Sequence, residues 1–207
     1  MKTNVMAVID FETTGLSPTV GARAIEIAAV LVSDGRVIDR FASLMNPGVT
    51  VPYEITELTG ITTKMVRSAP PAPQVMRDVT AFIGDARLVA HNAAFDRKFL
   101  EAEHRRIGVS RPLDFVCTML LSRRLFHDLP NHKLGSLARH LNLPVDGTLH
   151  RALADAMVTA ELMMRIQAEI VRRYGLTLEH RALARVQKAP HKDLEKVMKA
   201  LESRTES

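Results

Sequence analysis

Short apolar runs separated by polar turns mark the first quarter of the chain. Residues 5–9 are apolar throughout, as in a strand that is buried on both faces. Two further runs rich in strand-forming residues, 24–33 and 36–45, flank Asp34-Gly35, a pair that favours a tight hairpin turn. The pattern therefore predicts three consecutive strands, the last two joined as a hairpin.

The spacing of apolar residues changes to a helical period after residue 52. The longest helix is predicted over residues 151–174, where apolar residues recur at every fourth position before Gly175 ends the pattern. Shorter helices and two short strands alternate before it. The helices are predicted at 53–66 (two turns broken at Gly60), 69–85, 93–108, 118–126 and 134–141, and the strands at 87–90 and 112–117.

The order of these elements predicts an α/β fold. Three antiparallel strands followed by parallel strands that alternate with helices give a mixed sheet with helices on both faces. We expect one domain over residues 1–174. Because the composition shifts after Gly175, residues 175–207 are expected to form a helical extension with a polar tail.

Composition and charge narrow the class of protein only a little. A content of 46% hydrophobic and 25% charged residues is ordinary for a globular protein, and the net charge of +5 weakly favours a polyanionic partner. The single cysteine, Cys117, excludes an internal disulfide and fits a reducing compartment. The longest apolar run, residues 27–32, is far shorter than the ~18 residues of a membrane span. A soluble cytoplasmic protein without a membrane partner is expected.

Two acids directly follow the first apolar run. Asp10 and Glu12 are two residues apart, so in a strand their side chains leave the same face. Neighbouring carboxylates repel each other and stay ionised together at low cost only when a cation lies between them. Taken alone, however, the pair fits a solvent-exposed strand end better than a metal site.

Two later segments offer matching chemistry. Asp96 lies in the first turns of the helix that follows the strand at 87–90. His150 and Asp155 are five residues apart and would point ~140° apart within one helix, so they serve one site only if His150 lies in the preceding loop. Each segment alone is explained better by an ordinary polar helix start than by a metal site.

Together, these four carboxylates and one histidine in a basic chain predict a phosphodiesterase with two Mg²⁺ or Mn²⁺ ions. The sequence has no cysteine cluster for structural zinc, no phosphate-binding Gly-x-x-x-x-Gly-Lys loop and no Gly-x-Ser-x-Gly motif of serine hydrolases. These absences remove the main competing reaction classes.

The sequence resembles the DEDDh 3′–5′ exonucleases, a family with a ribonuclease H-like fold that includes the proofreading subunit of bacterial DNA polymerase III. Three motifs carry the resemblance in order: VIDFETTGL (8–16), HNAAFD (91–96) and HRALAD (150–155). The resemblance covers about residues 5–172. A histidine five residues before the last aspartate distinguishes this branch from the one that uses tyrosine.

The resemblance implies a role for each residue of the constellation. Asp10 would bridge both metal ions. Glu12 and Asp155 would complete the site of the ion that binds the attacking water, and Asp96 would hold the second ion. His150 would be the general base, a task for which a histidine side chain is suited near neutral pH.

The resemblance also assigns a substrate pocket. Backbone at Thr13 and Thr14 would contact the terminal 3′-OH, and Gly15 would let the backbone approach the nucleotide closely. Leu16 and Phe95 would pack on the last bases, a grip that tolerates any sequence, although Phe95 fits a core position equally well. The complete expected set is Thr13, Thr14, Gly15, Leu16, Ile61, Asn92 and Phe95.

The leading functional prediction is hydrolysis from the 3′ end of single-stranded or frayed DNA, in replication proofreading or repair. RNA ends or short oligoribonucleotides are the alternative substrate, because one 2′-OH distinguishes them. A non-catalytic module that binds a polymerase or repair partner is disfavoured, since all five catalytic positions are present. A homodimer is left open. Residues after 174 lack a flexible linker and a clamp-binding peptide, so a stand-alone exonuclease is expected.

Overall fold

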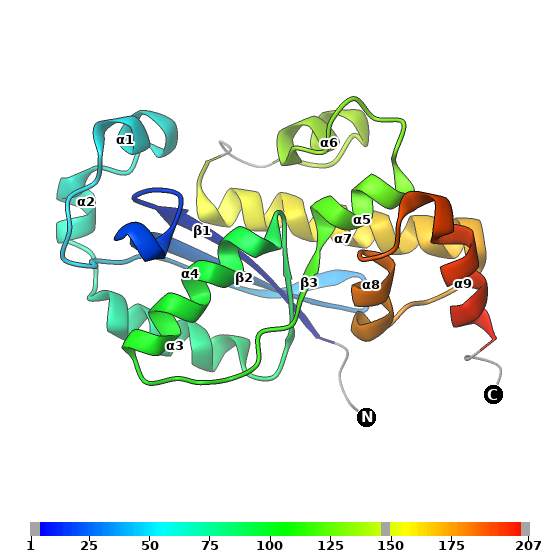
Figure 1. The fold of residues 1–207 in the computed structure, drawn as a ribbon. Helices are drawn as coiled ribbons and strands as arrows, with labels where there is room; N and C mark the ends of the chain where they lie inside the picture. Colours follow the sequence, from blue (N-terminus) through cyan, green and yellow to red (C-terminus); the bar gives the residue numbers. More distant parts are fainter. Residues whose placement is uncertain (1–4, 146–149, 204–207) are drawn as a thin grey trace.

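The computed structural model describes residues 5–145 and 150–203, and its fold is shown in Figure 1. The described strands form one five-stranded sheet in the order β3-β2-β1-β4-β5. The strands are β1 (Met6–Thr13), β2 (Ala24–Ser33), β3 (Arg36–Leu44), β4 (Arg87–Ala90) and β5 (Phe115–Cys117).

The sheet is mixed, as predicted. β2 pairs antiparallel with both β1 and β3, whereas β4 pairs parallel with β1 and β5. The turn between β2 and β3 is Asp34-Gly35, and both residues have positive φ angles, 50° and 71°. A two-residue hairpin turn of the favoured type requires this backbone, and Asp-Gly adopts it readily.

Helices cover both faces of the sheet (Figure 1). One core lies between the sheet and α3 and α4, and a second lies between the sheet and α7 with the helices around it. The helices of the described residues are α1 (Tyr53–Thr59), α2 (Thr63–Arg67), α3 (Ala72–Ile83), α4 (Ala93–Arg106), α5 (Thr118–Leu125), α6 (Leu134–His140), α7 (Ala152–Tyr174), α8 (His180–Val186) and α9 (Leu194–Glu202), with 3-10 turns η1 (Pro18–Val20) and η2 (His191–Asp193).

The segment after Gly175 packs on the core beneath α7. Leu176, Val186 and Met198 belong to the same hydrophobic cluster as Val8 of β1. The side chain of Gln187 accepts a hydrogen bond from the N–H of Cys117 at 2.6 Å and donates one to the carbonyl of Phe115 at 3.0 Å, so it satisfies backbone groups of the edge strand β5. The domain boundary near residue 174 remains a prediction.

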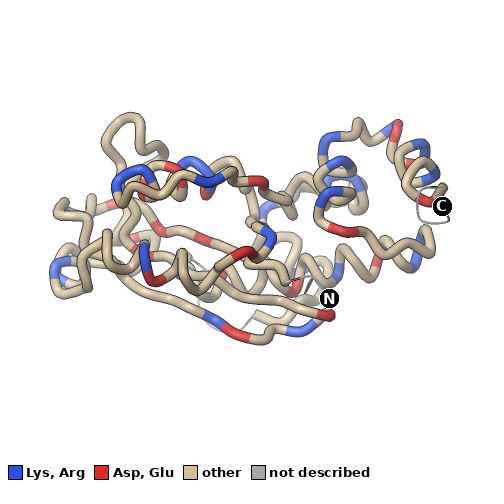
Figure 2. Tube along the Cα trace, turned by 90° about the horizontal axis from the view of Figure 1, so that it is seen from below, with Lys and Arg blue, Asp and Glu red and all other residues tan. Residues whose placement is uncertain are grey.

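Charged residues are interspersed along the chain. Figure 2 shows Lys and Arg alternating with Asp and Glu, including on the C-terminal helices. Among the described helices, none is both long enough and apolar enough to cross a membrane.

Candidate active site

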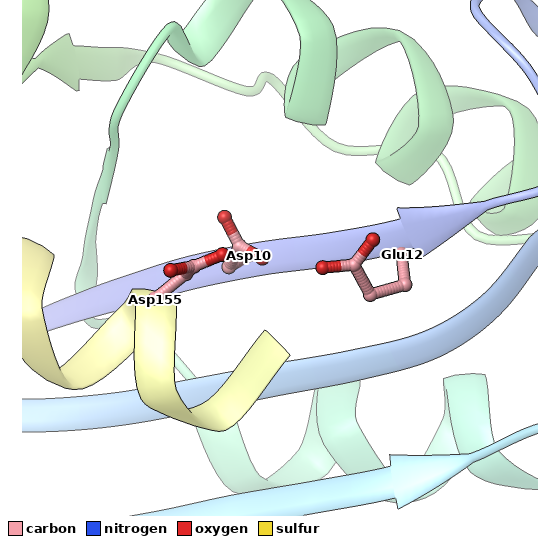
Figure 3. Close-up of side chains that lie close together, drawn as sticks. All are labelled: Asp10, Glu12 and Asp155. Atoms are coloured by element: carbon pink, nitrogen blue, oxygen red, sulfur yellow. The ribbon is translucent and has the colours of Figure 1, made fainter. Parts of the chain in front are cut away.

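Three carboxylates converge between β1 and the start of α7 (Figure 3). One oxygen each from Asp10, Glu12 and Asp155 lies within 4.8 Å of the other two. Val8 packs in the core beneath α7, and side chains two residues apart share a face of the strand, so Asp10 and Glu12 also point toward α7. The two acids lie within β1, which continues to Thr13, rather than beyond the end of the strand.

Asp96 approaches the same strand from α4. Its side chain is almost completely buried, with 2% exposed, and Oδ1 accepts a hydrogen bond from the N–H of Phe11 at 3.2 Å. β1 pairs with β4 only from Met6 to Val8. The N–H of Phe11 lies beyond that pairing, and Asp96 accepts its hydrogen bond in place of a strand. Asp96 therefore stands beside the three-carboxylate group but outside it.

Burial, together with repulsion from neighbouring carboxylates, raises the pKa of each of these four carboxyl groups. The pKa of Glu12 rises to about 8, first because of burial and then because of Asp155 and Glu26. Burial likewise raises the pKa of Asp96 to about 8, and it raises the pKa of Asp10 well above the usual range, with Asp96 as the next cause. Burial also raises the pKa of Asp155.

A divalent cation would relieve both the desolvation and the repulsion of this group. The donors are carboxylate oxygens alone, which suit Mg²⁺ or Mn²⁺ and not the sulfur-rich sites of structural zinc. The residues therefore fit the predicted class of metal ion, and the three-carboxylate group is where an ion would be held.

His150 lies in the loop immediately before α7, and Asp155 lies in the first turn of that helix. This is the arrangement that the five-residue spacing required. The backbone of His150 is in the left-handed region, with φ of +70°, which residues other than glycine rarely adopt. Its N–H donates a hydrogen bond to Oδ2 of Asp155 at 3.0 Å, and its side chain is exposed. Residues 146–149 of the predicted loop lie outside the described residues.

A cavity of about 360 Å³ adjoins the carboxylates. Five of the seven predicted pocket residues line it: Thr13, Thr14, Gly15, Leu16 and Phe95. The side chain of Leu16 is 84% exposed, so it is free to contact a ligand. The ring of Phe95 lies 5.0 Å from that of Phe99, so Phe95 serves both as a cavity wall and as the margin of the core.

The Thr-Thr-Gly turn is fixed by its own hydrogen bonds. Thr13 Oγ1 donates to the carbonyl of Gly15 at 2.7 Å. The N–H of Thr14 donates to the carbonyl of Arg23, and Thr14 Oγ1 accepts from the N–H of Arg23, both at 2.9 Å. A Cβ added at Gly15 would lie 3.4 Å from Cβ of Ala22, so a small residue suits this position. The turn therefore presents a rigid wall to the cavity.

Two predicted pocket residues lie elsewhere. Ile61 is completely buried, packs with Ile25, Val51 and Val66, and does not line this cavity, so its place in the substrate pocket stays a prediction. Asn92 is exposed and lines a different cavity, of about 530 Å³, beside α4.

Helix α1 supplies the part of the cavity wall that sequence reasoning missed. Ile55 and Leu58 line the cavity together with Glu54. The spacing of three between Ile55 and Leu58, and the 54% exposure of Leu58, are consistent with an apolar helix face that looks outward. The sequence alone does not say which face of so short a helix meets the core.

A buried acid beside this group, Glu26, also escaped the sequence analysis. It lies opposite Glu12 in the register of β1 and β2 and pairs with Arg151. The available signal was a charged residue inside the otherwise apolar stretch AIEIAAV, because a buried charge requires a partner.

Comparison with known proteins identifies the class to which this geometry belongs. Residues 7–163 match a family model described as exonuclease. The chain belongs to this exonuclease family. It is 40% identical over 156 residues to the DNA polymerase III PolC-type of Clostridium perfringens, a match that covers 75% of this chain and 11% of that polymerase. This chain thus corresponds to a small part of a much longer relative.

Solved structures share the fold of this exonuclease family member. Exonuclease X, in complex with 5′-overhanging duplex DNA, matches with a TM-score of 0.67 and 28% identity over 86% of this chain and 99% of that one. The nuclease domain of 3′hExo, a DEDDh family member bound to rAMP, matches with a TM-score of 0.70 and 23% identity over 81% of this chain and 94% of that one. Two expectations from the motifs, membership of an exonuclease family and the fold that such enzymes share, are confirmed.

Proposed function

We propose that this protein is a metal-dependent 3′–5′ exonuclease that removes nucleotides from the 3′ end of single-stranded or frayed DNA, in replication proofreading or repair. The observation that carries the proposal is the convergence of Asp10, Glu12 and Asp155 within 4.8 Å. The buried Asp96 beside them and the exposed His150 next to Asp155 support it. Membership of the exonuclease family supports the same reaction class.

Two divalent ions, Mg²⁺ or Mn²⁺, complete the proposed site. Asp10, Glu12 and Asp155 would hold one ion, and Asp10 and Asp96 would hold the other. When bound, such ions acidify a water molecule and neutralise negative charge on the phosphate and on the departing oxygen. The raised pKa values of Glu12 and Asp96 support this assignment, because a cation would lower the cost of ionising them together.

The side chains of the protein would do the remaining work. His150 accepts a proton from the water whose oxygen attacks the phosphorus atom. The bond from phosphorus to the 3′ oxygen of the preceding nucleotide then breaks, which releases a nucleoside 5′-monophosphate. Leu16 and Phe95 pack on the terminal bases, and the rigid Thr13-Thr14 turn positions the terminal 3′-OH.

DNA is the proposed substrate because two of the compared proteins support it. The polymerase from Clostridium perfringens is named as a DNA polymerase, and Exonuclease X was solved with DNA. The same similarity supports a polymerase or repair protein as partner.

A cytoplasmic location is also proposed, supported by the buried free thiol of Cys117, which suits a reducing compartment.

A comparison of labelled oligonucleotides tests the proposal. Single-stranded DNA and RNA of one sequence, each labelled at the 5′ end, are incubated with the protein and Mg²⁺, alongside DNA blocked by a 3′-phosphate. DNA is expected to shorten stepwise from its 3′ end, faster than RNA and faster than the blocked strand. Faster degradation of RNA would mean that RNA, and not DNA, is the substrate. Cleavage within the strand would contradict exonuclease activity.

A further inference from the structure

Glu26 of β2 and Arg151 form a partly buried ion pair beside the carboxylate group. The Glu26 side chain is 6% exposed and that of Arg151 is 43% exposed. Nη2 of Arg151 donates to Oε1 of Glu26 at 2.6 Å, and Nε donates to Oε2 at 3.1 Å, so the contact is bidentate. Such a fork fixes the orientation of both groups as well as their distance.

The same carboxylate holds the start of α7. Oε2 of Glu26 also accepts a hydrogen bond from the N–H of Ala152 at 3.0 Å. Ala152 is the first residue of α7, whose first N–H groups have no partner within the helix. Glu26 faces Glu12 across the pairing of β1 with β2. One side chain therefore connects the strand beside Glu12 to the helix that carries Asp155.

His150 lies between these anchors. Its φ of +70° is unfavourable for histidine, and such a backbone persists only when its surroundings determine it. On one side, the N–H of His150 is bonded to Asp155. On the other, Arg151 follows directly and is held by Glu26. Within the described residues, these are the contacts that define the backbone at His150.

We propose that Glu26 and Arg151 are positioning residues for the reaction: they fix the backbone at His150 so that its imidazole reaches the site. This inference rests on the role of His150 as general base under the proposed function. It assigns a task to two residues that neither line the cavity nor belong to the three-carboxylate group.

The competing explanation is a pair that only stabilises the fold, as many buried ion pairs do. The chain offers a matched control at the other end of α7. Glu169, 8% exposed, is bonded to Arg172 and Arg173. Loss of this pair changes stability without reaching the site.

The test compares Glu26→Gln, Arg151→Gln and Glu169→Gln in the full chain. Each variant is first checked by thermal unfolding, and kcat and KM are then measured on single-stranded DNA with saturating Mg²⁺. Glu26→Gln and Arg151→Gln are expected to lower kcat by about 10- to 100-fold with little change in KM, the usual cost when a supporting contact of a catalytic group is lost. Glu169→Gln is expected to keep wild-type kcat. Arg151 is partly exposed, so its replacement tests the proposal even if Glu26→Gln fails to fold.

Two further measurements separate positioning from stability. In a His150→Ala background, Glu26→Gln should cause no further loss of kcat, because the group that it positions is gone. Amide hydrogen exchange at His150, which needs no activity, should be faster in Arg151→Gln than in the wild type and unchanged in Glu169→Gln.

The outcomes are distinct. If His150→Ala lowers kcat while folded Glu26→Gln and Arg151→Gln keep it, only the positioning role is overturned. An equal loss of kcat from Glu26→Gln with and without His150 also overturns it. If His150→Ala keeps full turnover, the proposed function fails and this inference fails with it.

Discussion

The backbone N–H of His150 donates a hydrogen bond to Oδ2 of Asp155 at 3.0 Å, which joins the proposed general base to a proposed metal ligand. The two residues come from different elements, since His150 precedes α7 and Asp155 lies in its first turn. The bond uses the backbone of His150 and leaves its imidazole free. The side chain is therefore available for proton transfer while Asp155 remains directed at Asp10 and Glu12.

Replacing His150 with Ala should reduce turnover and spare metal binding. A general base contributes about 10²–10⁴-fold to rate, so kcat should fall by that factor. The bond from His150 to Asp155 uses the main chain, which alanine retains, so Mn²⁺ affinity measured by calorimetry should change little. A large loss of Mn²⁺ affinity would show instead that the imidazole is a ligand.

The metal-free protein should lose stability as the pH rises through the neutral range. Glu12 and Asp96 have a pKa of about 8 in the folded state, against ordinary values of 4.5 and 3.8. Between these values the folded state binds more protons than the unfolded state, so the free energy of unfolding falls with rising pH. This stabilisation is complete below the ordinary pKa values and is lost as the pH passes about 8.

Thermal unfolding in EDTA measures this effect. His91 and His104, whose pKa values are lowered to about 4 mainly by burial, act in the opposite direction below the ordinary histidine value of 6.5. The decline in Tm should therefore be clearest between pH 6.5 and pH 8. Asp96→Asn should give a shallower decline there, and the same slope in both proteins would contradict the raised pKa of Asp96.

Metal addition should stabilise the fold most at the high end of that pH range. Ions compete with protons for Asp10, Glu12 and Asp155, so affinity rises with pH and binding releases protons. With Mn²⁺ at 100 times its dissociation constant, the gain in free energy of unfolding is about 2.7 kcal/mol. The increase in Tm should be larger at pH 8 than at pH 6.5, and Glu12→Gln should reduce it. An increase that does not depend on pH would place the ion elsewhere.

The cavity walls should control substrate binding more than chemistry. Leu16→Ala and Phe95→Ala remove surfaces on which terminal bases would stack, an interaction worth about 1–3 kcal/mol per base. KM for single-stranded DNA is expected to rise by about 5- to 150-fold, with a smaller effect on kcat. Val20→Ala is the matched control, because Val20 is also highly exposed, at 82%, but does not line the cavity. An equal rise of KM in all three variants would argue against stacking.

Local patterns predicted most of the elements. The two strands around Asp34-Gly35 were predictable because strand-forming residues and turn chemistry agree there, and the long helix because its apolar residues keep one face up to Gly175. Asp10 and Glu12 indicated a metal site only together with the distant motifs, since an exposed strand end explains the two acids better when they are taken alone.

The remaining features depend on packing that the sequence does not encode locally. Ile61 packs into a core cluster, and Ile55 and Leu58 of α1 line the cavity. Glu26 acquires its partner from Arg151, 125 residues later, and only the register of β1 and β2 brings it opposite Glu12. A single sequence carries no direct signal for such long-range contacts.

Degradation of single-stranded DNA by the wild type and by Asp10→Ala tests the central claim most directly. A 5′-labelled strand is incubated with each protein at saturating Mg²⁺, and the products are resolved by length. The wild type should give a ladder that shortens from the 3′ end, and Asp10→Ala, folded at the assay temperature, should leave the strand intact because the ligand shared by both ions is gone. Wild-type degradation by Asp10→Ala would contradict the account.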